Sequence, residues 1–415
     1  MSSFLEPSII GGVKVGLDQP VRVMGVINLS PESFYRGSIA RSVDEAFRMA
    51  VSMVDEGVDF IDIGGMSTAP YKETYVPVEV EAERVKPVIL ELSKSIEVPI
   101  SIDTRRSRVA EIALEAGASI VNDTSGLKHD GDMVRVVRDH DASVILMAYG
   151  DVSDPSDPVR CVRRLLMESI DIAVGNGVSH DRIVVDPGIG FFRDTGIPWY
   201  EWDSKIIRGI RRLHILGRPI MIGVSRKSFI GRILGKEDPG ERLIGSVAAE
   251  SISVYNGVSM VRTHNVRETI QAIRLAEYIR PRIRIVRHRR LKIVDFDSIL
   301  YMDDVRDLMH YIDVDESGIE IMAGKGEHRV IYIEGIPRLL SIVLKQEMLA
   351  IGGEAATPKD AIFSGFSDTS VILMGTMKQY GMLIGKLKRM DFRSLRDRGL
   401  INSMELAEIL EEILT

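Results

Sequence analysis

Short apolar runs alternate with longer amphipathic segments between Val21 and about Arg280. The short runs are rich in Val, Ile and Met and nearly continuous, which is typical of parallel strands covered on both faces. The expected strands are Val21–Asn28, Phe60–Gly65, Ile100–Thr104, Ile120–Asp123, Ser143–Met147, Ile183–Asp186, Ile220–Ser225 and Met260–His264.

The segments between these runs carry apolar residues at helical spacing. The expected helices are Ser42–Glu56, Val78–Ile96, Arg106–Ala116, Val159–Asn176, Glu241–Asn256 and Val266–Ile279. Several end in glycine, namely Gly57, Gly117, Gly177 and Gly257. Because glycine adopts positive φ without strain, it suits the tight turn from a helix into the next strand.

Eight strand–helix units within about 260 residues match the size of a TIM barrel. An open, doubly wound sheet is the main alternative fold. The number of strand–helix units, eight, favours the barrel. The sequence therefore predicts an α/β fold, a (β/α)8 TIM barrel over residues 1–282. A second, smaller C-terminal α/β domain is expected over residues 283–415.

The character of the chain changes after Ile279. Residues 280–290 form a basic stretch with interleaved apolar residues, which we interpret as a surface linker or an exposed edge strand. The elements expected beyond it are strands at Arg329–Glu334 and Ser370–Met374 and helices at Pro337–Ile351, Thr376–Arg389 and Met404–Leu414.

Composition places the chain among globular proteins. Its 415 residues are 45% hydrophobic and 27% charged, and 53 basic against 60 acidic residues give a net charge of −7. This balance excludes disorder or a coiled coil as the main architecture. A mildly acidic chain is also a poor candidate for binding nucleic acid, whose phosphates attract basic residues.

The location expected from the sequence is the cytoplasm. Cys161 is the single cysteine, so an intrachain disulfide is impossible and a reducing compartment is the natural setting. Residues 1–12 lack the features of a signal peptide, and no apolar run approaches the roughly 20 residues that span a bilayer. We therefore expect no membrane association.

Polar and ionisable side chains follow most of the expected strands. In a parallel barrel the carboxyl ends of the strands and the loops after them build the active site. Any one of these residues has an ordinary structural explanation, such as capping the next helix. Capping does not explain why so many of these residues lie at the same rim of the barrel. They include Asn28, Asp62, Ser67, Thr68, Asp103, Asn122, Asp186, Ser225, Lys227, Arg262 and His264.

The residue types fall into two sets. Asp103, Asn122, Asp186 and Lys227 offer acceptors and donors suited to a planar, amide-rich heterocycle. Arginine, histidine, asparagine and hydroxyl groups are suited to a phosphate or diphosphate, and an asparagine oxygen could bind Mg²⁺ held against it. The second set is Arg262, His264, Asn28, Ser67 and Thr68.

Several common motifs are absent. The sequence holds no phosphate-binding P-loop and no glycine-rich dinucleotide fingerprint after a strand. It also has no cysteine pair or His-Glu-x-x-His motif for zinc. Cys161 falls inside an expected helix, away from the rim, and is interpreted as a buried core thiol rather than a nucleophile.

Over roughly Val21 to Ile279 the sequence resembles dihydropteroate synthase, a pterin-binding TIM-barrel family of folate synthesis. Seven segments in the same order make the resemblance specific. They are residues 24–34 (MGVINLSPESF), 62–65 (DIGG), 101–104 (SIDT), 121–123 (VND), 186–191 (DPGIGF), 223–231 (GVSRKSFIG) and 261–264 (VRTH).

The resemblance implies a transferase that joins 6-hydroxymethyl-7,8-dihydropterin diphosphate to p-aminobenzoate and releases diphosphate. It implies that the pterin is bound by Asp103, Asn122, Asp186 and Lys227. It implies a diphosphate site of Asn28, Thr68, Arg262 and His264, with Mg²⁺ as cofactor on Asn28. It implies an arylamine site of Thr68, Pro70, Phe191 and Ser225, covered by the loop of residues 30–34.

The resemblance also implies catalytic roles for Lys227, Asp186, Arg262 and His264. Cleavage of the C–O bond builds negative charge on the departing diphosphate, and Arg262, His264 and Mg²⁺ would stabilise it. The carboxylates near the ring would favour the electron-deficient pterin. Loop closure would exclude competing water.

Two loops depart from the family pattern. The second loop has Met66 where the family has Glu and Ala69 where it has Arg, and the fifth has Ala148 in place of His. Without this arginine, the loop lacks a guanidinium that would bind the diphosphate or the arylamine carboxylate through two hydrogen bonds. Arg36 or Arg193 could substitute for it. A modified arylamine therefore stays open as the second substrate.

Two other functions stay open. A pterin-dependent methyltransferase shares the barrel and pterin pocket, although methyl transfer releases no diphosphate and does not explain Arg262 and His264. A non-catalytic pterin-binding homologue is the other. The segments at residues 344–356 and 373–380 are similar to an accessory region beside some bacterial and archaeal synthases. The family resemblance also implies a homodimer.

Overall fold

A computed structural model describes residues 5–31, 35–67, 76–152, 156–280, 284–289, 291–295, 302–322, 329–359, 368–390 and 400–414. The chain divides into two compact units, residues 1–281 and 282–415. Each unit is described by itself.

Within the described part of the first unit, eight parallel strands pair in the order β8-β7-β6-β5-β4-β3-β10-β9. A further bridge between Val185 and Ile220 joins the two ends of this order and closes the barrel. The strands are β3 (Arg22–Asn28), β4 (Phe60–Gly64), β5 (Ile100–Asp103), β6 (Ile120–Asp123), β7 (Ser143–Met147), β8 (Ile183–Asp186), β9 (Met221–Ile222) and β10 (Met260–Thr263).

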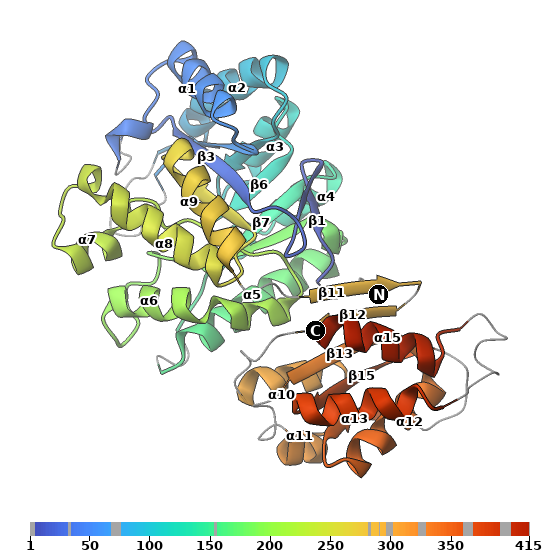
Figure 1. The fold of residues 1–415 in the computed structure, drawn as a ribbon. Coiled ribbons are helices and arrows are strands. Elements are labelled where there is room, and N and C mark those ends of the chain that lie inside the picture. Colours follow the sequence, from blue (N-terminus) through green and yellow to red (C-terminus); the bar gives the residue numbers. More distant parts are fainter. Residues whose placement is uncertain are drawn as a thin grey trace. The chain divides into compact units, whose positions relative to one another are not determined.

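Helices surround these strands (Figure 1). They are α1 (Val43–Asp55), α2 (Val78–Ser95), α3 (Ser107–Glu115), α4 (Met133–Asp139), α5 (Pro158–Gly175), α6 (Trp199–Gly209), α7 (Ser228–Leu234), α8 (Leu243–Tyr255) and α9 (Val266–Ile279), with short 3-10 turns η1 (Arg36–Ser38), η2 (His180–Arg182), η3 (Ile210–Leu216) and η4 (Pro239–Arg242). The TIM barrel predicted from the sequence is confirmed.

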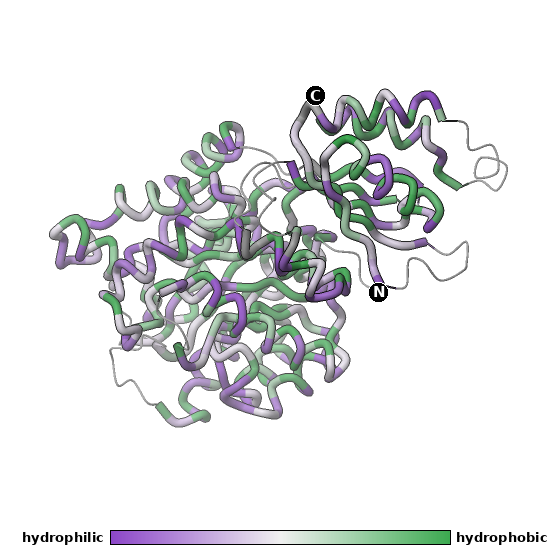
Figure 2. The backbone as a smooth tube through the Cα atoms, turned by 90° about the horizontal axis from the view of Figure 1, so that it is seen from below, coloured by the Kyte–Doolittle hydropathy of each residue, from purple (hydrophilic) through white to green (hydrophobic). Residues whose placement is uncertain are grey.

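Local sequence explains where the helices begin and end. The Ser42 side chain caps α1 by accepting from the Glu45 backbone N–H at 3.1 Å. Ala46 and Ala50 lie on its buried face, and hydrophobic residues alternate with hydrophilic ones along the outer helices (Figure 2). As predicted, Gly57 adopts a positive φ of +94° after α1.

A hairpin that the sequence pattern did not reveal packs on the amino ends of the strands. It consists of β1 (Ser8–Ile10) and β2 (Val13–Val15), paired antiparallel. The Ser8 hydroxyl donates to the Ile183 carbonyl at 2.7 Å. Ile10 packs with apolar side chains inside the barrel, among them Met24, Phe60 and Ile120. This end is therefore closed by protein, which leaves the carboxyl ends as the place for a site.

In the described part of the second unit, five antiparallel strands pair in the order β11-β12-β13-β15-β14. They are β11 (Arg284–His288), β12 (Leu291–Asp295), β13 (Arg329–Pro337), β14 (Glu354–Ala356) and β15 (Asp368–Gly375). The helices are α10 (Met302–Tyr311), α11 (Glu316–Met322), α12 (Arg338–Ala350), α13 (Met377–Leu387) and α15 (Ser403–Leu414).

The basic stretch after Ile279 supplies β11, which pairs only with β12 among the described strands, so the edge-strand interpretation is confirmed. Apolar residues of α12, α13 and α15 form one core with the sheet. None of the described helices has the length and apolar character needed to cross a bilayer.

Candidate active site

The pairing registers align polar residues at the carboxyl ends of neighbouring strands. Asn28 of β3 lies beside Gly64 of β4, Gly64 beside Asp103 of β5, and Asp103 beside Asn122 of β6. A Cβ on Gly64 would lie 3.2 Å from the Asn28 Oδ1 atom. The absent side chain therefore leaves room beside the Asn28 amide, and three predicted site residues share one row.

A carboxylate–guanidinium cluster occupies the rim next to this row. The Arg262 Nε donates to Asp62 Oδ2 at 2.7 Å, and its Nη2 donates to Asp103 Oδ2 at 2.8 Å. The Asn122 Nδ2 donates to the same Asp62 oxygen at 3.2 Å. The pKa of Arg262 is raised, because the two carboxylates outweigh the opposing effect of burial. Sequence reasoning placed Asp62 on the rim without assigning it a role; here it positions both Arg262 and Asn122.

The other oxygens of the two carboxylates have no partner in the part of the chain that the structure describes. Asp62 Oδ1 and Asp103 Oδ1 are buried and make no hydrogen bond to any described residue. Burial raises the pKa of Asp103 to about 7, with Arg262 opposing the shift and the Asp62 carboxylate adding to it. Buried polar atoms are almost always hydrogen-bonded, so these oxygens are acceptors available to a ligand.

Lys227 immediately precedes α7, at its N-cap position, and reaches back over the turn after β8. Its ammonium donates to the Ile189 carbonyl and lies 4.6 Å from the centre of the Phe191 ring. Burial lowers the pKa of Lys227 to about 8, while the charges of Asp186 and Asp203 oppose that shift. The predicted residues Lys227 and Phe191 are therefore in contact, and the lysine stays protonated at neutral pH.

Asp186 ends β8 on the same side of the barrel. Its Oδ1 accepts from the Gly188 backbone N–H at 2.8 Å. Burial raises the pKa of Asp186, and the charges of Lys227 and Arg262 oppose the shift. Asp186 and Lys227 thus form an acceptor and a donor that act on each other electrostatically.

Asp203 is a buried carboxylate that sequence reasoning missed. It lies inside α6, and its Oδ1 accepts from the Gly190 backbone N–H at 2.9 Å. Its Oδ2 is buried without a partner among the described residues. Burial raises the pKa of Asp203 to about 6, and Lys227 opposes the shift. A lone acidic residue inside an amphipathic helix gives little signal in a sequence.

His264 follows β10 and is held by Ser225. Its Nδ1 lies 3.1 Å from the Ser225 Oγ, and its backbone N–H donates to the same oxygen at 3.3 Å. The Tyr35 ring meets the imidazole edge-on, with 5.3 Å between ring centres. Burial, then the charges of Arg262 and Arg226, lower the pKa of His264 to about 3. The imidazole is therefore neutral in the absence of an anion.

Arg226 stabilises the turn that carries Ser225 and Lys227. Its φ is +57°, in the left-handed region. Its Nε donates to the Asn265 Oδ1 at 2.9 Å, and its guanidinium lies 4.2 Å from the centre of the Tyr35 ring. The strand expected at Ile220–Ser225 is too long. In the structure the strand pairing ends at Ile222, because the chain then turns sharply and presents its polar residues.

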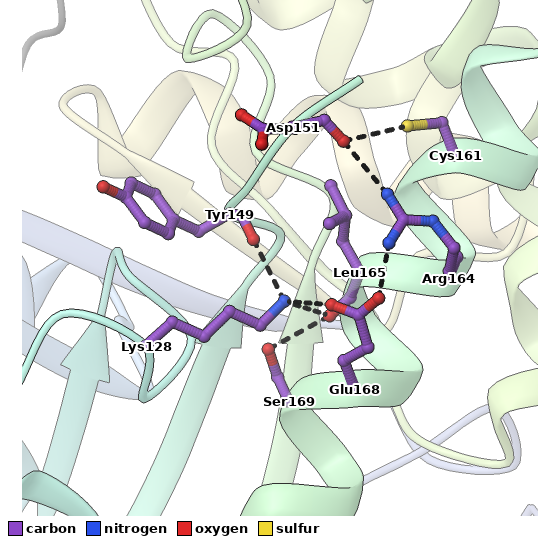
Figure 3. A network of polar contacts seen from close by, with 8 residues as sticks. All are labelled: Lys128, Tyr149, Asp151, Cys161, Arg164, Leu165, Glu168 and Ser169. Carbon is purple, nitrogen blue, oxygen red and sulfur yellow. Dashed lines mark hydrogen bonds and ion pairs between the residues drawn. The ribbon is translucent and has the colours of Figure 1, made fainter. Parts of the chain in front are cut away.

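The loop after β7, where Ala148 replaces a family histidine, is fixed from outside the barrel (Figure 3). The Lys128 Nζ donates to the Tyr149 carbonyl at 3.0 Å and to the Glu168 carboxylate at 2.9 Å. The Arg164 guanidinium donates to the Asp151 carbonyl at 3.0 Å. Cys161 is 2% exposed beside this network and lies in α5, as predicted.

Thr68, Pro70 and Ala69 lie outside the described residues, as do residues 32–34 and the Arg36 side chain. The described ends of the second loop are anchored. The Arg84 guanidinium donates to the Gly65 carbonyl at 2.9 Å, and the Arg106 guanidinium donates to the Val76 carbonyl at 2.8 Å.

The donor set of the site suits Mg²⁺ only where substrate phosphates supply further oxygens. No group of three or more His, Cys, Asp or Glu side chains within the described residues could hold a metal ion by itself. The Asn28 Nδ2 donates to the Ser38 Oγ at 2.8 Å, which leaves its Oδ1 as a neutral oxygen ligand. Mg²⁺ is commonly held by one or two protein oxygens together with substrate phosphates, and Asn28 fits that use.

Comparisons with known proteins agree with this geometry. The sequence model of the family described as pterin binding enzyme matches residues 24–264. The dihydropteroate synthase of Synechocystis is 36% identical over 285 residues, covering 67% of this chain and 96% of that protein. The dihydropteroate synthase of Bacillus subtilis is 38% identical over 255 residues, covering 61% and 87%.

Solved structures resemble the barrel unit. A Clostridium difficile dihydropteroate synthase crystallised with pteroic acid has a TM-score of 0.57 and 36% identity, covering 67% of this chain and 99% of that one. A Xanthomonas albilineans dihydropteroate synthase with 4-aminobenzoic acid has a TM-score of 0.59 and 34% identity, covering 67% and 98%.

Proposed function

The chain belongs to the pterin-binding enzyme family of the dihydropteroate synthases, and from that premise we propose that it condenses 6-hydroxymethyl-7,8-dihydropterin diphosphate with p-aminobenzoate or a modified arylamine. The products are dihydropteroate, or its analogue, and diphosphate. The observation that carries the proposal is the pair of buried oxygens on Asp62 and Asp103 beside Arg262, which have no hydrogen-bond partner among the described residues.

The pterin site is formed by Asp103, Asn122, Asp186 and Lys227. A pterin presents an amino group and ring N–H groups as donors, and a carbonyl and ring nitrogens as acceptors. The buried carboxylate oxygens of Asp103 and Asp186 accept from the former, and the Lys227 ammonium and Asn122 amide donate to the latter. Their burial strengthens these hydrogen bonds.

The diphosphate lies toward Asn28, Arg262 and His264, with Thr68 as a further donor. Arg262 contacts the Asp103 carboxylate and so lies between the pterin and diphosphate sets. Mg²⁺ bound by Asn28 and the phosphates would supply positive charge to the leaving group. His264 is neutral without an anion, and the charge of a bound diphosphate would raise its pKa.

The reaction breaks the bond between the pterin methylene carbon and the diphosphate oxygen. That oxygen keeps the bonding electrons, and the amine nitrogen forms the new bond to carbon and then loses a proton. Arg262 and His264 stabilise the charge that develops on the leaving diphosphate. The carboxylates near the ring stabilise the positive charge that develops on the pterin.

The arylamine site uses Phe191 and Ser225, together with Thr68 and Pro70. The Arg193 guanidinium donates to the Ser228 Oγ at 2.8 Å and stacks 4.2 Å from the centre of the Trp199 ring. Ser228 directly follows Lys227 in the chain, and the charge of Arg193 acts to lower the pKa of Lys227. Arg193 is therefore the better supported substitute for the arginine missing at position 69.

A homodimer in the cytoplasm completes the proposal. Large apolar side chains stay exposed on α8 and α9, among them Ile244 at 85%, Leu275 at 63% and Tyr278 at 83%. Apolar clusters of this kind are typical of interaction surfaces. Sedimentation of the wild type and of Ile244→Asp tests it: the variant should be monomeric, and a monomeric wild type would contradict the dimer.

The experiment that tests the activity identifies the product. Purified protein is incubated with dihydropterin diphosphate, Mg²⁺ and p-aminobenzoate, and the mixture is analysed by mass spectrometry. Dihydropteroate is the expected product. Binding of the pterin without any product would favour a non-catalytic homologue. In a separate incubation with a methylpterin, loss of its methyl group would favour the methyltransferase. Repeating the assay across substituted anilines identifies the preferred arylamine.

A further inference from the structure

A buried carboxyl group that the proposed reaction does not use lies behind the site. Glu250 is in the middle of α8 and is fully buried. Its Oε2 accepts from the Thr269 hydroxyl at 2.8 Å, and its Oε1 has no hydrogen-bond partner among the described residues. Burying a carboxylate with one unpartnered oxygen costs much more free energy than burying the protonated acid.

The charges around Glu250 are few. Burial raises the pKa of Glu250 to about 7, and the hydroxyls of Thr269 and Thr263 oppose this shift. Arg226, from the turn between β9 and α7, also lowers the pKa, and Glu268 of α9 raises it. The group is therefore poised to hold or release a proton near neutral pH.

Three hydroxyls connect Glu250 to His264, and we call Thr269, Thr263 and Ser225 the hydroxyl chain. The Thr269 and Thr263 oxygens are 2.8 Å apart. The Thr263 hydroxyl lies 3.5 Å from the Ser225 Oγ, which is the longest link. Ser225 then meets the Nδ1 of His264 at 3.1 Å. The chain begins at a buried acid and ends at a residue of the diphosphate site.

The direction of the chain depends on the acid. Each hydroxyl has one hydrogen to donate. When Glu250 is protonated and donates to Thr269, each hydroxyl can donate to the next, and Ser225 donates to the Nδ1 of His264. When Glu250 is ionised, Thr269 must donate to it instead, and Thr263 turns toward Thr269. Ser225 then receives no hydrogen bond from Thr263.

The tautomer of His264 follows from this direction. The imidazole is neutral without an anion, so one ring nitrogen carries the proton and the other accepts. If Ser225 donates to Nδ1, the proton must be on Nε2. A neutral imidazole with its proton on Nε2 offers a hydrogen-bond donor at that nitrogen to an anionic oxygen.

We propose that Glu250 is a positioning residue that acts through the hydroxyl chain to keep the proton of His264 on Nε2. The inference rests on the proposed function only in taking His264 to contact the diphosphate. A purely structural role for Glu250 would affect the free energy of unfolding and leave the tautomer unchanged.

The test reads the tautomer directly. Long-range ¹H–¹⁵N spectra of protein labelled with ¹⁵N-histidine distinguish the two forms, and His264→Gln assigns the signal. The proteins are the wild type, Glu250→Gln and Thr269→Val, each titrated from pH 5.5 to 8.5. Ser253→Ala is the matched control, since its buried hydroxyl on α8 bonds only to the Ala249 carbonyl among the described residues.

The wild type should show the Nε2–H form below about pH 7 and a growing Nδ1–H fraction above it. Glu250→Gln should hold the Nε2–H form throughout, because the amide donates at every pH. Thr269→Val should show a mixture at every pH. Its KM for dihydropterin diphosphate should rise about threefold to tenfold, as expected for one weakened hydrogen bond, with the KM for p-aminobenzoate unchanged. Ser253→Ala should match the wild type.

An unchanged tautomer in wild type, Glu250→Gln and Thr269→Val across the whole pH range would overturn the inference. If Thr269→Val fails to fold, as judged by circular dichroism, the comparison of wild type with Glu250→Gln still decides. The spectra need no substrate. A protein that makes no dihydropteroate but shows the predicted tautomers would refute the proposed function alone.

Discussion

The Arg262 guanidinium of β10 donates to the Asp103 carboxylate of β5 at 2.8 Å, joining residues 159 positions apart in the chain. The barrel brings their strands to one rim, with β3 and β4 between them. The arginine is thereby oriented before any ligand arrives, and such preorganisation lowers the free energy needed to stabilise charge in a transition state.

Removal of this guanidinium should abolish most activity. Arg262→Ala leaves two buried carboxylates without their cation and removes a donor to the leaving diphosphate. We expect diphosphate release to fall about 100-fold or more and the free energy of unfolding to fall by about 3 kcal/mol. Assays of release and urea unfolding check this. Arg22→Ala is the control, because its ion pair with Asp59 lies at the start of β3; equal losses in both variants would contradict the account.

Activity should decline at alkaline pH because Lys227 loses its proton. Its pKa is lowered to about 8, so the cation is present below that pH and lost above it. Asp203→Asn removes a carboxylate that favours the cation, and the alkaline limb of kcat/KM should therefore move to lower pH. Asp194→Asn changes an exposed carboxylate in the segment between β8 and α6 and should leave the limb in place. A limb that does not move in Asp203→Asn refutes this role.

Gly190→Ala should impair pterin binding. Gly190 has a φ of +82°, and an added Cβ would lie 3.0 Å from the Lys227 Cδ. The left-handed backbone costs a residue with a side chain about 1–2 kcal/mol, and the lysine must shift as well. We expect lower stability and a raised KM for the pterin substrate. Gly131→Ala, where nothing lies within 4 Å of the added Cβ, should do neither; similar effects in both variants would dismiss the steric argument.

The barrel was predictable because its strands are continuous apolar runs. The expected bounds of β6, β7 and β8 agree with the structure. The rim position of Asp103, Asp186 and Lys227 followed from the rule that carboxyl ends of parallel strands share one face.

Other features are set by tertiary structure and leave no local signal in the sequence. The strands of the amino-terminal hairpin are three residues each, too short for a periodic signal. The partnership of Asp62 with Arg262 depends on the pairing of β3 with both β4 and β10 and not on spacing in the chain. Asp203 and Glu250 look like ordinary polar positions of amphipathic helices, and only their burial shows that they face inward.

The stability of the barrel should fall in mild acid through His214. Its Nε2 contacts the Gly257 carbonyl at 3.0 Å, and burial lowers its pKa from 6.5 to about 4. Between these values the unfolded chain binds the proton and the folded one does not. The stabilisation from neutral His214 is therefore complete above pH 6.5 and lost as the pH falls toward 4. The free energy of unfolding should fall by up to about 3 kcal/mol over this range. Unfolding by urea at pH 4.5 and 7 measures it. His214→Gln should flatten this part of the profile, and an unchanged slope would rule the histidine out.

Diphosphate release in the presence and absence of p-aminobenzoate tests the central claim most directly. The account predicts release from dihydropterin diphosphate that requires both the arylamine and intact Lys227 and Arg262. Release at the wild-type rate by folded Lys227→Ala and Arg262→Ala proteins, or no release by the wild type with any arylamine, would contradict it.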